Sequence, residues 1–149
     1  MATITAVNSV FMLAVAGLFP TPQKLQEYSV DDAFTFDIAD TAETQVGVDG
    51  YGVAGYVPRT VPMTIRFLAS SVSLDLFEQW IGAQDAAGEI LYCSAVISQP
   101  SIGRKYTAYY GTLMRVSTMA DVRRVLAARE FHISWLPQGP IPAISAAPL

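Results

Sequence analysis

The sequence contains one cysteine, one histidine and few charged residues, and each shortage excludes a class of protein. Cys93 cannot form a disulfide or a cysteine-based zinc site within one chain, and its apolar surroundings favour a buried, inert thiol. His132 has no second imidazole with which to hold a metal, and any Ser-His-Asp catalysis would have to run through it. We therefore predict no catalytic residues, no metal site and no cofactor, and we expect that the chain is not an enzyme.

Glycine-rich and acidic runs are present, but their patterns favour structure over chemistry. The run from Val48 to Gly55 lacks the lysine and the following helix that a phosphate-binding loop needs, so it is expected to form turns. The adjacent carboxylates Asp31 and Asp32 point to opposite faces of a strand. This placement favours a hydrated acidic face over acid–base catalysis.

Charged residues make up 15% of the chain, against roughly 25% in ordinary globular domains, and hydrophobic residues make up 52%. The longest apolar run, Val10–Phe19, is shorter than the about 20 residues of a membrane-spanning helix. No Lys or Arg precedes Lys24, so a secretory leader is not favoured. The apolar surplus instead favours an oligomer, because obligate interfaces resemble a core cut in half. The length of 149 residues predicts one domain, residues 1–149.

The few charges are unevenly placed along the chain. Residues 1–58 hold seven acidic residues and one lysine, a balance of −6, whereas residues 59–149 hold eight basic and six acidic residues, a balance of +2. The overall net charge of −4 has the wrong sign for a protein that grips nucleic acid by its phosphates. The opposite signs of the two parts offer complementary surfaces for a contact between stacked copies.

Apolar and polar residues alternate with the period of a strand in several segments. Asp49-Gly50 is the strongest short hairpin signal, because such a turn needs positive φ. Two prolines predict a loop at residues 19–23, and a proline-rich, uncharged tail predicts an extended C-terminal arm at residues 137–149. The predicted strands cover residues 9–18, 30–38, 53–57, 60–68, 88–98, 105–117 and 127–135.

Residues 71–84 carry the clearest helical pattern. Ser71 or Ser73 can cap the first turn, and Gly82 is expected to stop the helix after about ten residues. A single helix with one apolar side is suited to cover a sheet. The side chains expected to do so are Leu74, Phe77, Trp80 and Ile81. The predicted fold class is mainly β: an antiparallel β-sandwich or barrel with one short α-helix.

The predicted strand at residues 105–117 would be roughly 40 Å long at about 3.3 Å per residue. Such a strand overhangs a chain of this size unless neighbouring copies support it. Long alternating strands with open edges also aggregate, and closing a sheet across subunits removes those edges. Both arguments favour a sheet that other copies complete.

The order of these segments resembles the tail tube proteins of contractile-tailed bacteriophages, the myovirus type. The likeness is carried best by the unit from Gly47 to Gln84, in "GVDGYGVAGYVPRTVPMTIRFLASS" and "FEQWIGAQ", and by the closing "AAREFHISW". It covers residues 7–136 and leaves out the apolar tail after Trp135. Residues 1–149 are thus expected to form a single tail-tube-like domain, with residues 137–149 as an arm.

The resemblance implies hexameric rings in which each subunit supplies strands to an intersubunit β-barrel around a channel, with the helix outside. Rings of this family stack head to tail, and phage DNA passes through without specific binding. The implied partners are other copies of the chain and the tail sheath, baseplate and tape measure proteins. The implied location is the tail of the virion, assembled in the host cytoplasm, with no membrane contact.

The acidic residues then receive a physical role. Lys or Arg facing a DNA channel would bind phosphates and release counterions at every step, whereas carboxylates repel the duplex. We expect Asp37, Asp40, Glu43 and Asp49 to line the lumen or a ring edge. The sequence leaves both uses open, since the same acidic surface could meet the basic part of the next ring.

Three other functions are weighed against a phage tail tube. One is the tube subunit, similar to Hcp, of a contractile injection or type VI secretion apparatus, which conducts protein. Another is a monomeric β-barrel module that binds a ligand. The least favoured is a hydrolase that uses His132. A tube subunit assembles into tubes with an axial hole, whereas a binding module stays monomeric.

Overall fold

The computed structural model describes residues 9–25, 34–38, 40–100 and 102–148, which form antiparallel sheets and one helix. The predicted class, mainly β with a single helix, is confirmed for these residues. The elements are β1 (Val10–Val15), β2 (Phe19–Lys24), β3 (Phe34–Phe36), β4 (Ala42–Val46), β5 (Gly52–Tyr56), β6 (Val61–Phe67), α1 (Leu74–Ala87), β7 (Cys93–Gln99), β8 (Arg104–Val116), β9 (Arg129–Trp135) and β10 (Ile144–Pro148).

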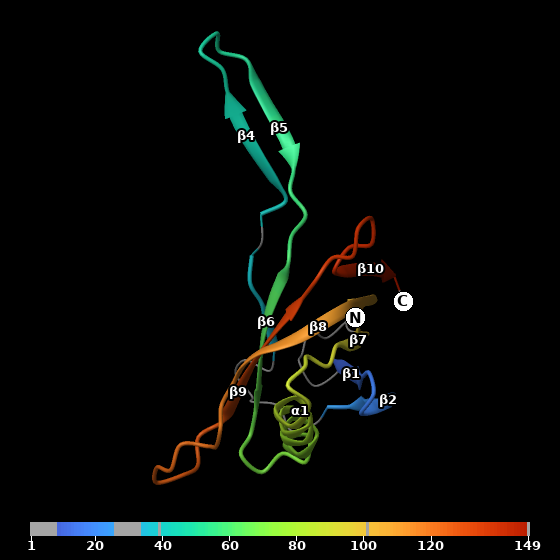
Figure 1. The fold of residues 1–149 in the computed structure, drawn as a ribbon, viewed down its shortest axis with the longest axis vertical. Helices are drawn as coiled ribbons and strands as arrows, with labels where there is room; N and C mark the ends of the chain where they lie inside the picture. The colour runs from blue at the N-terminus through green and yellow to red at the C-terminus, as the bar shows by residue number, and fades with distance from the viewer. Residues whose placement is uncertain (1–8, 26–33, 39, 101, 149) are drawn as a thin grey trace.

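A sheet of eight strands forms the body of the molecule, in the order β2-β1-β7-β8-β9-β6-β3, with β10 also paired to β8 (Figure 1). The sheet is curled. This is seen from strands near its two ends, since the rings of Phe11 in β1 and Phe34 in β3 meet edge to face with centroids 5.4 Å apart. The outermost strands of this path, β2 and β3, do not pair with each other. Over the described residues the sheet is therefore curled but open.

The helix α1 covers one face of the sheet and determines which side chains are buried (Figure 1). Phe77 stacks on Phe131 of β9 with ring centroids 4.5 Å apart, and it also contacts Phe67 of β6. Trp80 is fully buried, and its indole N–H donates to the Leu91 carbonyl at 3.1 Å. The rest of the core includes Phe11, Leu13 and Val15 of β1, Met63 and Ile65 of β6, Cys93, Ala95 and Ile97 of β7, and Ile133 and Trp135 of β9.

The helix is longer than predicted. Gly82 does not stop it; the helix continues to Ala87 and ends at Gly88, which has a left-handed φ of +66° and donates its N–H to the Gln84 carbonyl. An internal glycine costs a helix only about 1 kcal/mol, and helix termination needs the left-handed residue that Gly88 provides. Of the four side chains expected to cover the sheet, Leu74, Phe77 and Trp80 are buried, and Ile81 packs on the core while partly exposed.

The segment predicted as a proline loop is a strand. Residues 19–24 form β2, which pairs with β1 in an antiparallel, irregular register. The prediction was wrong because proline is excluded only from central strands, where its missing N–H breaks the ladder. β2 lies at the end of the sheet path, so the prolines are tolerated there.

The side-chain alternation predicted for residues 105–117 breaks in the middle of β8. Tyr110 has φ +52°, and an extra residue here opposes β7, which is the geometry of a β-bulge. The bulge shifts the alternation by one residue, so Gly111 faces the core and Tyr110 is exposed. A second irregularity against β9 follows Leu113, and Met114 is also exposed. Tyr110 and Met114 are therefore exposed, although the strand period groups them with Ala108, which is buried.

β8 is paired with strands of its own chain along most of one edge, and along the other edge as far as Gly111. On one edge it pairs with β7, and on the other it pairs with β10 at residues 104–108 and with β9 at residues 111–116. Its own chain therefore supports much of this strand, whereas residues 112–116 have no strand partner on the β7 edge among the described residues. Part of the C-terminal arm supplies the support, because Ile144–Pro148 lies back along β8.

Several local predictions are confirmed. β9 alternates buried and half-buried residues as its sequence indicates, with Arg129, Phe131, Ile133 and Trp135 on the core side. The Asp-Gly pair closes a hairpin between β4 and β5, and Gly50 takes a φ of +87°. Residues 119–126, between the strands predicted at residues 105–117 and 127–135, form an irregular loop. Residues 30–33, the start of the strand predicted at residues 30–38, lie outside the described residues.

We predict that Gly111→Ala destabilises the fold. A Cβ at Gly111 would lie 2.5 Å from Cζ3 of Trp135 and 2.6 Å from Sγ of Cys93, both in the core. The expected loss is about 1–3 kcal/mol in the free energy of unfolding, measured by urea denaturation. Gly82→Ala is the matched control, since its Cβ meets nothing within 4 Å. This helical substitution should be neutral or stabilising by up to about 1 kcal/mol, and equal losses in both variants would contradict the packing argument.

Candidate functional site

The hairpin β4–β5 is the most exposed part of the described structure. It projects from the body along the longest axis of the molecule, and every residue of both strands is exposed (Figure 1). Its large apolar side chains reach solvent in the isolated chain: Val46, Val48, Tyr51, Val53 and Tyr56. A lone two-stranded hairpin is at best marginally stable in water. The hairpin is therefore a surface suited to contact with another chain.

The two faces of the hairpin differ in chemistry. The paired residues Ala42 and Tyr56 lie on the first face, as do Val46 and its partner Gly52, and this face carries no charged side chain. The opposite face carries Glu43. At the tip, the Gly47 N–H donates to the Tyr51 carbonyl at 2.8 Å, and the Tyr51 N–H donates to Oδ1 of Asp49 at 3.3 Å. The tip is thus a closed, hydrogen-bonded turn.

The four acidic residues predicted to line a lumen or ring edge are spread along this projection. Asp37 follows β3 at its base, Asp40 lies between β3 and β4, Glu43 is in β4 and Asp49 is at the tip. All four are exposed, and none has an ion-pair partner among the described residues. They do not converge on one point, so they form an acidic arm and not a paired carboxylate site.

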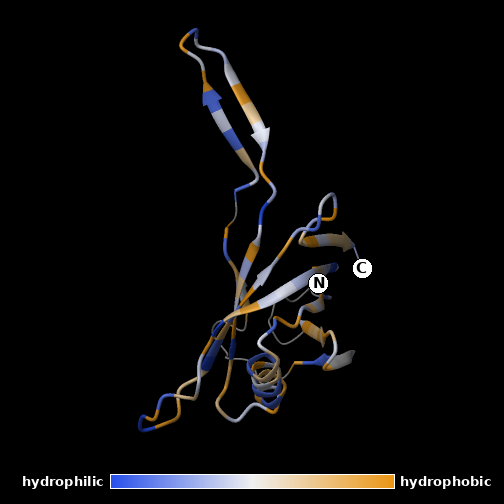
Figure 2. Cartoon of the chain, viewed as in Figure 1, coloured by the Kyte–Doolittle hydropathy of each residue, from blue (hydrophilic) through white to orange (hydrophobic). Residues whose placement is uncertain are grey.

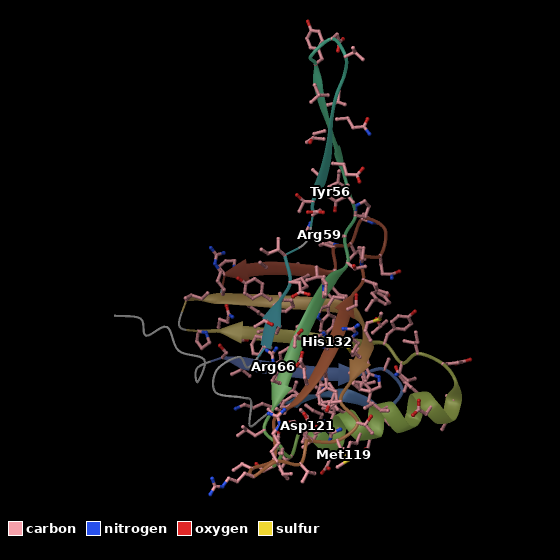
Figure 3. All side chains as sticks on the ribbon, turned by 90° about the vertical axis from the view of Figure 1, so that its left-hand side faces the viewer. Tyr56, Arg59, Arg66, Met119, Asp121 and His132 are labelled. Carbon is pink, nitrogen blue, oxygen red and sulfur yellow. The ribbon has the colours of Figure 1, made fainter. Side chains whose placement is uncertain are left out.

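A second projection lies at the other end of the long axis. We call residues 118–127 the basic loop, because it carries Arg123 and Arg124 with Asp121 as its one carboxylate. Met119 and Asp121 lie far from Tyr56 and Arg59 at the base of the hairpin (Figure 3). The loop exposes four large apolar side chains: Met119, Val122, Val125 and Leu126. Hydrophobic and hydrophilic residues are mixed on both projections (Figure 2).

A buried arginine anchors the base of the basic loop. Arg129 at the start of β9 is 5% exposed. Its Nη2 donates to the carbonyls of Ser117 at 2.8 Å and Thr118 at 3.1 Å, and its Nη1 pairs with Oε1 of Glu78 in α1 at 2.7 Å. Its guanidinium also lies over the Phe131 ring, 5.4 Å from the centroid. One side chain therefore ties the loop to the helix and to the core.

The sheet face opposite the core carries a polar network on β6 and β9. Thr64 Oγ1 and His132 Nδ1 are 3.2 Å apart, and His132 Nε2 lies 2.9 Å from Oε1 of Glu130. The other oxygen of Glu130 lies 3.6 Å from Nε of Arg66. Arg66 and His132 lie between the two projections (Figure 3). His132 is thus occupied on both ring nitrogens by strand neighbours, which is a structural arrangement.

A groove of about 570 Å³ opens at the base of the hairpin. It lies where β3 and the start of β6 approach β7, β8 and β10. Asp37 and Arg59 are its charged residues, and the rest of its lining is apolar or neutral. Its main lining side chains are Phe34, Phe36, Val61, Ile97, Tyr106 and Ile144. A groove of this size can accept an apolar side chain or a small molecule.

The remaining candidates for chemistry are inert in this arrangement. Cys93 is buried, and burial raises the pKa of its thiol well above the ordinary value, so the thiolate nucleophile does not form. Among the described residues, no three His, Cys, Asp or Glu side chains gather as metal ligands would. None of the helices described is long and apolar enough to cross a membrane.

Comparison with solved structures shows that components of contractile injection systems share this fold. The chain is similar to the tube-terminating cap of the anti-feeding prophage, with 8% identity, a TM-score of 0.59, and coverage of 100% of this chain and 93% of that one. It is similar to the sheath/tube terminator of the extracellular contractile injection system PVC in the extended state, with 10% identity, a TM-score of 0.60, and coverage of 99% and 98%. For the sheath–tube complex of the PVC system, these values are 12%, 0.58, 98% and 93%.

The chain therefore belongs to the class of proteins that have the fold of contractile injection system components. The family model described as tail fiber protein gp32 matches residues 2–137, and the chain belongs to this family. No curated protein matches the sequence. The chain is accordingly a structural, tail-associated protein, and the expected relation to contractile tails is confirmed at that level.

Sequence reasoning missed the importance of the basic loop. It left residues 119–126 between two predicted strands and assigned them no role. The signal that could have found this loop is its composition. Val122, Val125 and Leu126 are apolar, although they lie in a segment that is neither helix nor strand and are exposed there. Exposed apolar residues clustered beside charges mark contact surfaces.

We predict that Glu78→Ala destabilises the chain and loosens the basic loop. The substitution leaves the buried guanidinium of Arg129 without its carboxylate, at a cost of about 2 kcal/mol in unfolding free energy. Thermal denaturation measures the stability, and limited proteolysis at residues 118–127 measures the loop. Glu89→Ala is the control, since Glu89 is exposed just beyond the helix. Equal effects of the two substitutions would contradict the anchoring role.

Proposed function

We propose that the chain is the tail tube subunit of a contractile phage tail. Six copies form a ring around a central channel, the rings stack into a tube, and phage DNA passes through the channel. The observation that carries this proposal is the hairpin β4–β5, whose two strands leave the body with every residue exposed. Such a hairpin becomes stable when a neighbouring copy covers it.

The open sheet supports the same function. Within the described part of the chain, β2, β3 and β10 each have one edge without a strand partner. Open edges pair with other chains unless they are blocked or covered. In a ring, strands of neighbouring subunits close these edges and build the wall of an intersubunit β-barrel. A barrel built from several strands of each of six copies is wide enough to leave an aqueous channel.

The fold and the family support a non-enzymatic, structural role. Solved structures with this fold are described as a tube-terminating cap, a sheath/tube terminator and a sheath–tube complex. By analogy, this chain would contact its own copies inside the tail, the sheath around them, the baseplate at one end and the tape measure protein during assembly. The location in the tail of the virion follows from the same analogy, as does assembly in the host cytoplasm.

A second candidate is a terminator ring at one end of a tube. Two of the similar structures are described as terminators, with TM-scores of 0.59 and 0.60 and nearly complete coverage. A terminator forms a single ring that does not extend, whereas a tube subunit presents complementary surfaces on both sides of the ring. Projections at both ends of the long axis favour the tube subunit (Figure 1).

We predict that the purified chain forms tubes with an axial hole at high concentration, visible by negative-stain microscopy. Single rings would support the terminator, solid fibres would support a fibre subunit, and a monomer in light scattering would overturn the proposal. The cargo distinguishes a phage tube from a secretion tube. Tubes recovered from particles that deliver DNA support the first, and tubes that carry protein support the second.

We predict that removing the hairpin abolishes assembly without unfolding the chain. The Val57 N–H donates to the Thr41 carbonyl at 3.0 Å, so the base is already narrow enough for a two-residue Asn-Gly turn in place of residues 42–56. The variant should keep a cooperative thermal transition and stay monomeric at concentrations where the full chain forms tubes. Tubes of normal length from this variant would contradict the role of the hairpin.

The lumen role of the acidic residues has its own test. We predict that Asp37→Lys with Asp40→Lys leaves tubes intact but slows DNA delivery, because each new cation that faces the channel binds phosphates. The measurement is the rate of DNA release from assembled particles at two salt concentrations, with slower release at low salt. Failure to assemble would place these two residues in a contact between subunits.

A further inference from the structure

We infer that the tip of the hairpin of one copy binds the basic loop of the next copy along the tube. The tip is the turn at residues 47–51, and the basic loop is residues 118–127. This inference rests on the proposed function and specifies which surfaces hold consecutive rings together. It commits to a second copy of the same chain as the occupant of both surfaces.

The placement of the two surfaces makes them complementary in space. The hairpin leaves one end of the long axis and the basic loop leaves the other (Figure 1). The same separation holds in the perpendicular view, where Tyr56 and Arg59 lie toward one end and Met119 and Asp121 toward the other (Figure 3). A hairpin and a loop at opposite ends cannot meet within one copy. Between copies, they form a head-to-tail contact that repeats without closing, which generates a filament.

The two surfaces are also complementary in charge. The tip carries the carboxylate of Asp49 and no basic residue, and three more carboxylates lie in the rest of residues 37–57, whereas the basic loop carries two arginines and Asp121, a balance of +1. The pair between Arg123 and Asp121 is 3.8 Å long and largely exposed, so it holds Arg123 only weakly. Arg124 has no ion-pair partner among the described residues. Oppositely charged surfaces steer the approach of two rings and fix their orientation.

Apolar side chains supply the contact area. Val48 and Tyr51 at the hairpin tip are largely or fully exposed, as are Val122 and Val125 in the basic loop. Interfaces are built from an apolar centre with a charged rim, and both surfaces have this composition. Six such contacts between two rings act together, so a small area at each contact is sufficient.

Local hydrogen bonds restrain the turn at the tip and the base of the basic loop. The tip is a hydrogen-bonded turn that uses Oδ1 of Asp49, and the second carboxylate oxygen has no hydrogen-bond partner among the described residues. The base of the basic loop is held by Arg129, which donates to the carbonyls of Ser117 and Thr118. Surfaces that are ordered before contact lose less conformational entropy on binding.

Cross-linking tests the contact directly, and the single cysteine makes the background silent. Cys93 is buried with a raised thiol pKa, so it does not react in the folded chain. We expect that Val48→Cys with Val125→Cys, treated as assembled tubes with a short bismaleimide, gives a ladder of covalent multimers on denaturing gels. Each single substitution should give no ladder. Val48→Cys with Ile90→Cys is the matched control, because Ile90 is also exposed but lies just beyond α1.

Each outcome has one meaning. A ladder in the Val48→Cys, Val125→Cys tubes and in no control supports the inference. Tubes seen by microscopy without a ladder overturn the inference and leave the proposed function standing, as does a ladder with Ile90→Cys only. A cross-linked dimer from Val48→Cys alone indicates tip-to-tip contact and also overturns it. If the unsubstituted chain forms no tubes, the proposed function itself fails.

Charge reversal gives an independent measurement. We expect that Arg123→Glu with Arg124→Glu forms rings but raises the concentration needed for stacking about tenfold or more, with partial recovery at high salt. Arg104→Glu with Lys105→Glu makes the same change in net charge at the start of β8, away from the basic loop, and should stack as the unsubstituted chain does. Equal effects of the two double substitutions would show that only overall charge matters, and would overturn the inference.

Discussion

The stack of Phe77 on Phe131 is the interaction on which the rest of the arrangement depends. It seats α1 on one face of the curled sheet and makes that face the core. Helix and sheet together bury a compact set of aromatic and aliphatic side chains, whereas both strands of the hairpin and the apolar side chains of the basic loop are exposed. The molecule is thus stabilised by one packed core and leaves two projections exposed, which suits the proposed contacts between copies.

Much of the fold could be predicted from residue patterns, because burial imposes the same period on sequence and structure. β9 shows this best, since its alternation of apolar and polar residues matches its alternation of burial. The Asp49-Gly50 turn is also local, because positive φ at a glycine needs no tertiary partner. The burial of Leu74, Phe77 and Trp80 against the sheet could be predicted from the helical period alone. The four acidic residues could be identified from the sequence, but their position along one projecting arm could not be predicted from it.

The failures arise where tertiary position overrides local pattern. Prolines exclude a central strand but not the edge position of β2, and no local pattern says which strand is at an edge. Tyr110 adopts a backbone conformation that non-glycine residues rarely take, and the bulge it creates shifts the alternation of the following side chains up to the second irregularity after Leu113. The importance of the basic loop depends on its distance from the hairpin, which is a property of the whole fold.

The position of Arg129 has a mechanical consequence. The guanidinium that holds the base of the loop also pairs with Glu78 on the helix and lies against Phe131 in the core. A tensile force applied at residues 118–127 would therefore pass straight into the best-packed part of the subunit and bypass the edge strands. In the proposed tube, such a path would let neighbouring rings pull on each other without peeling open the sheet.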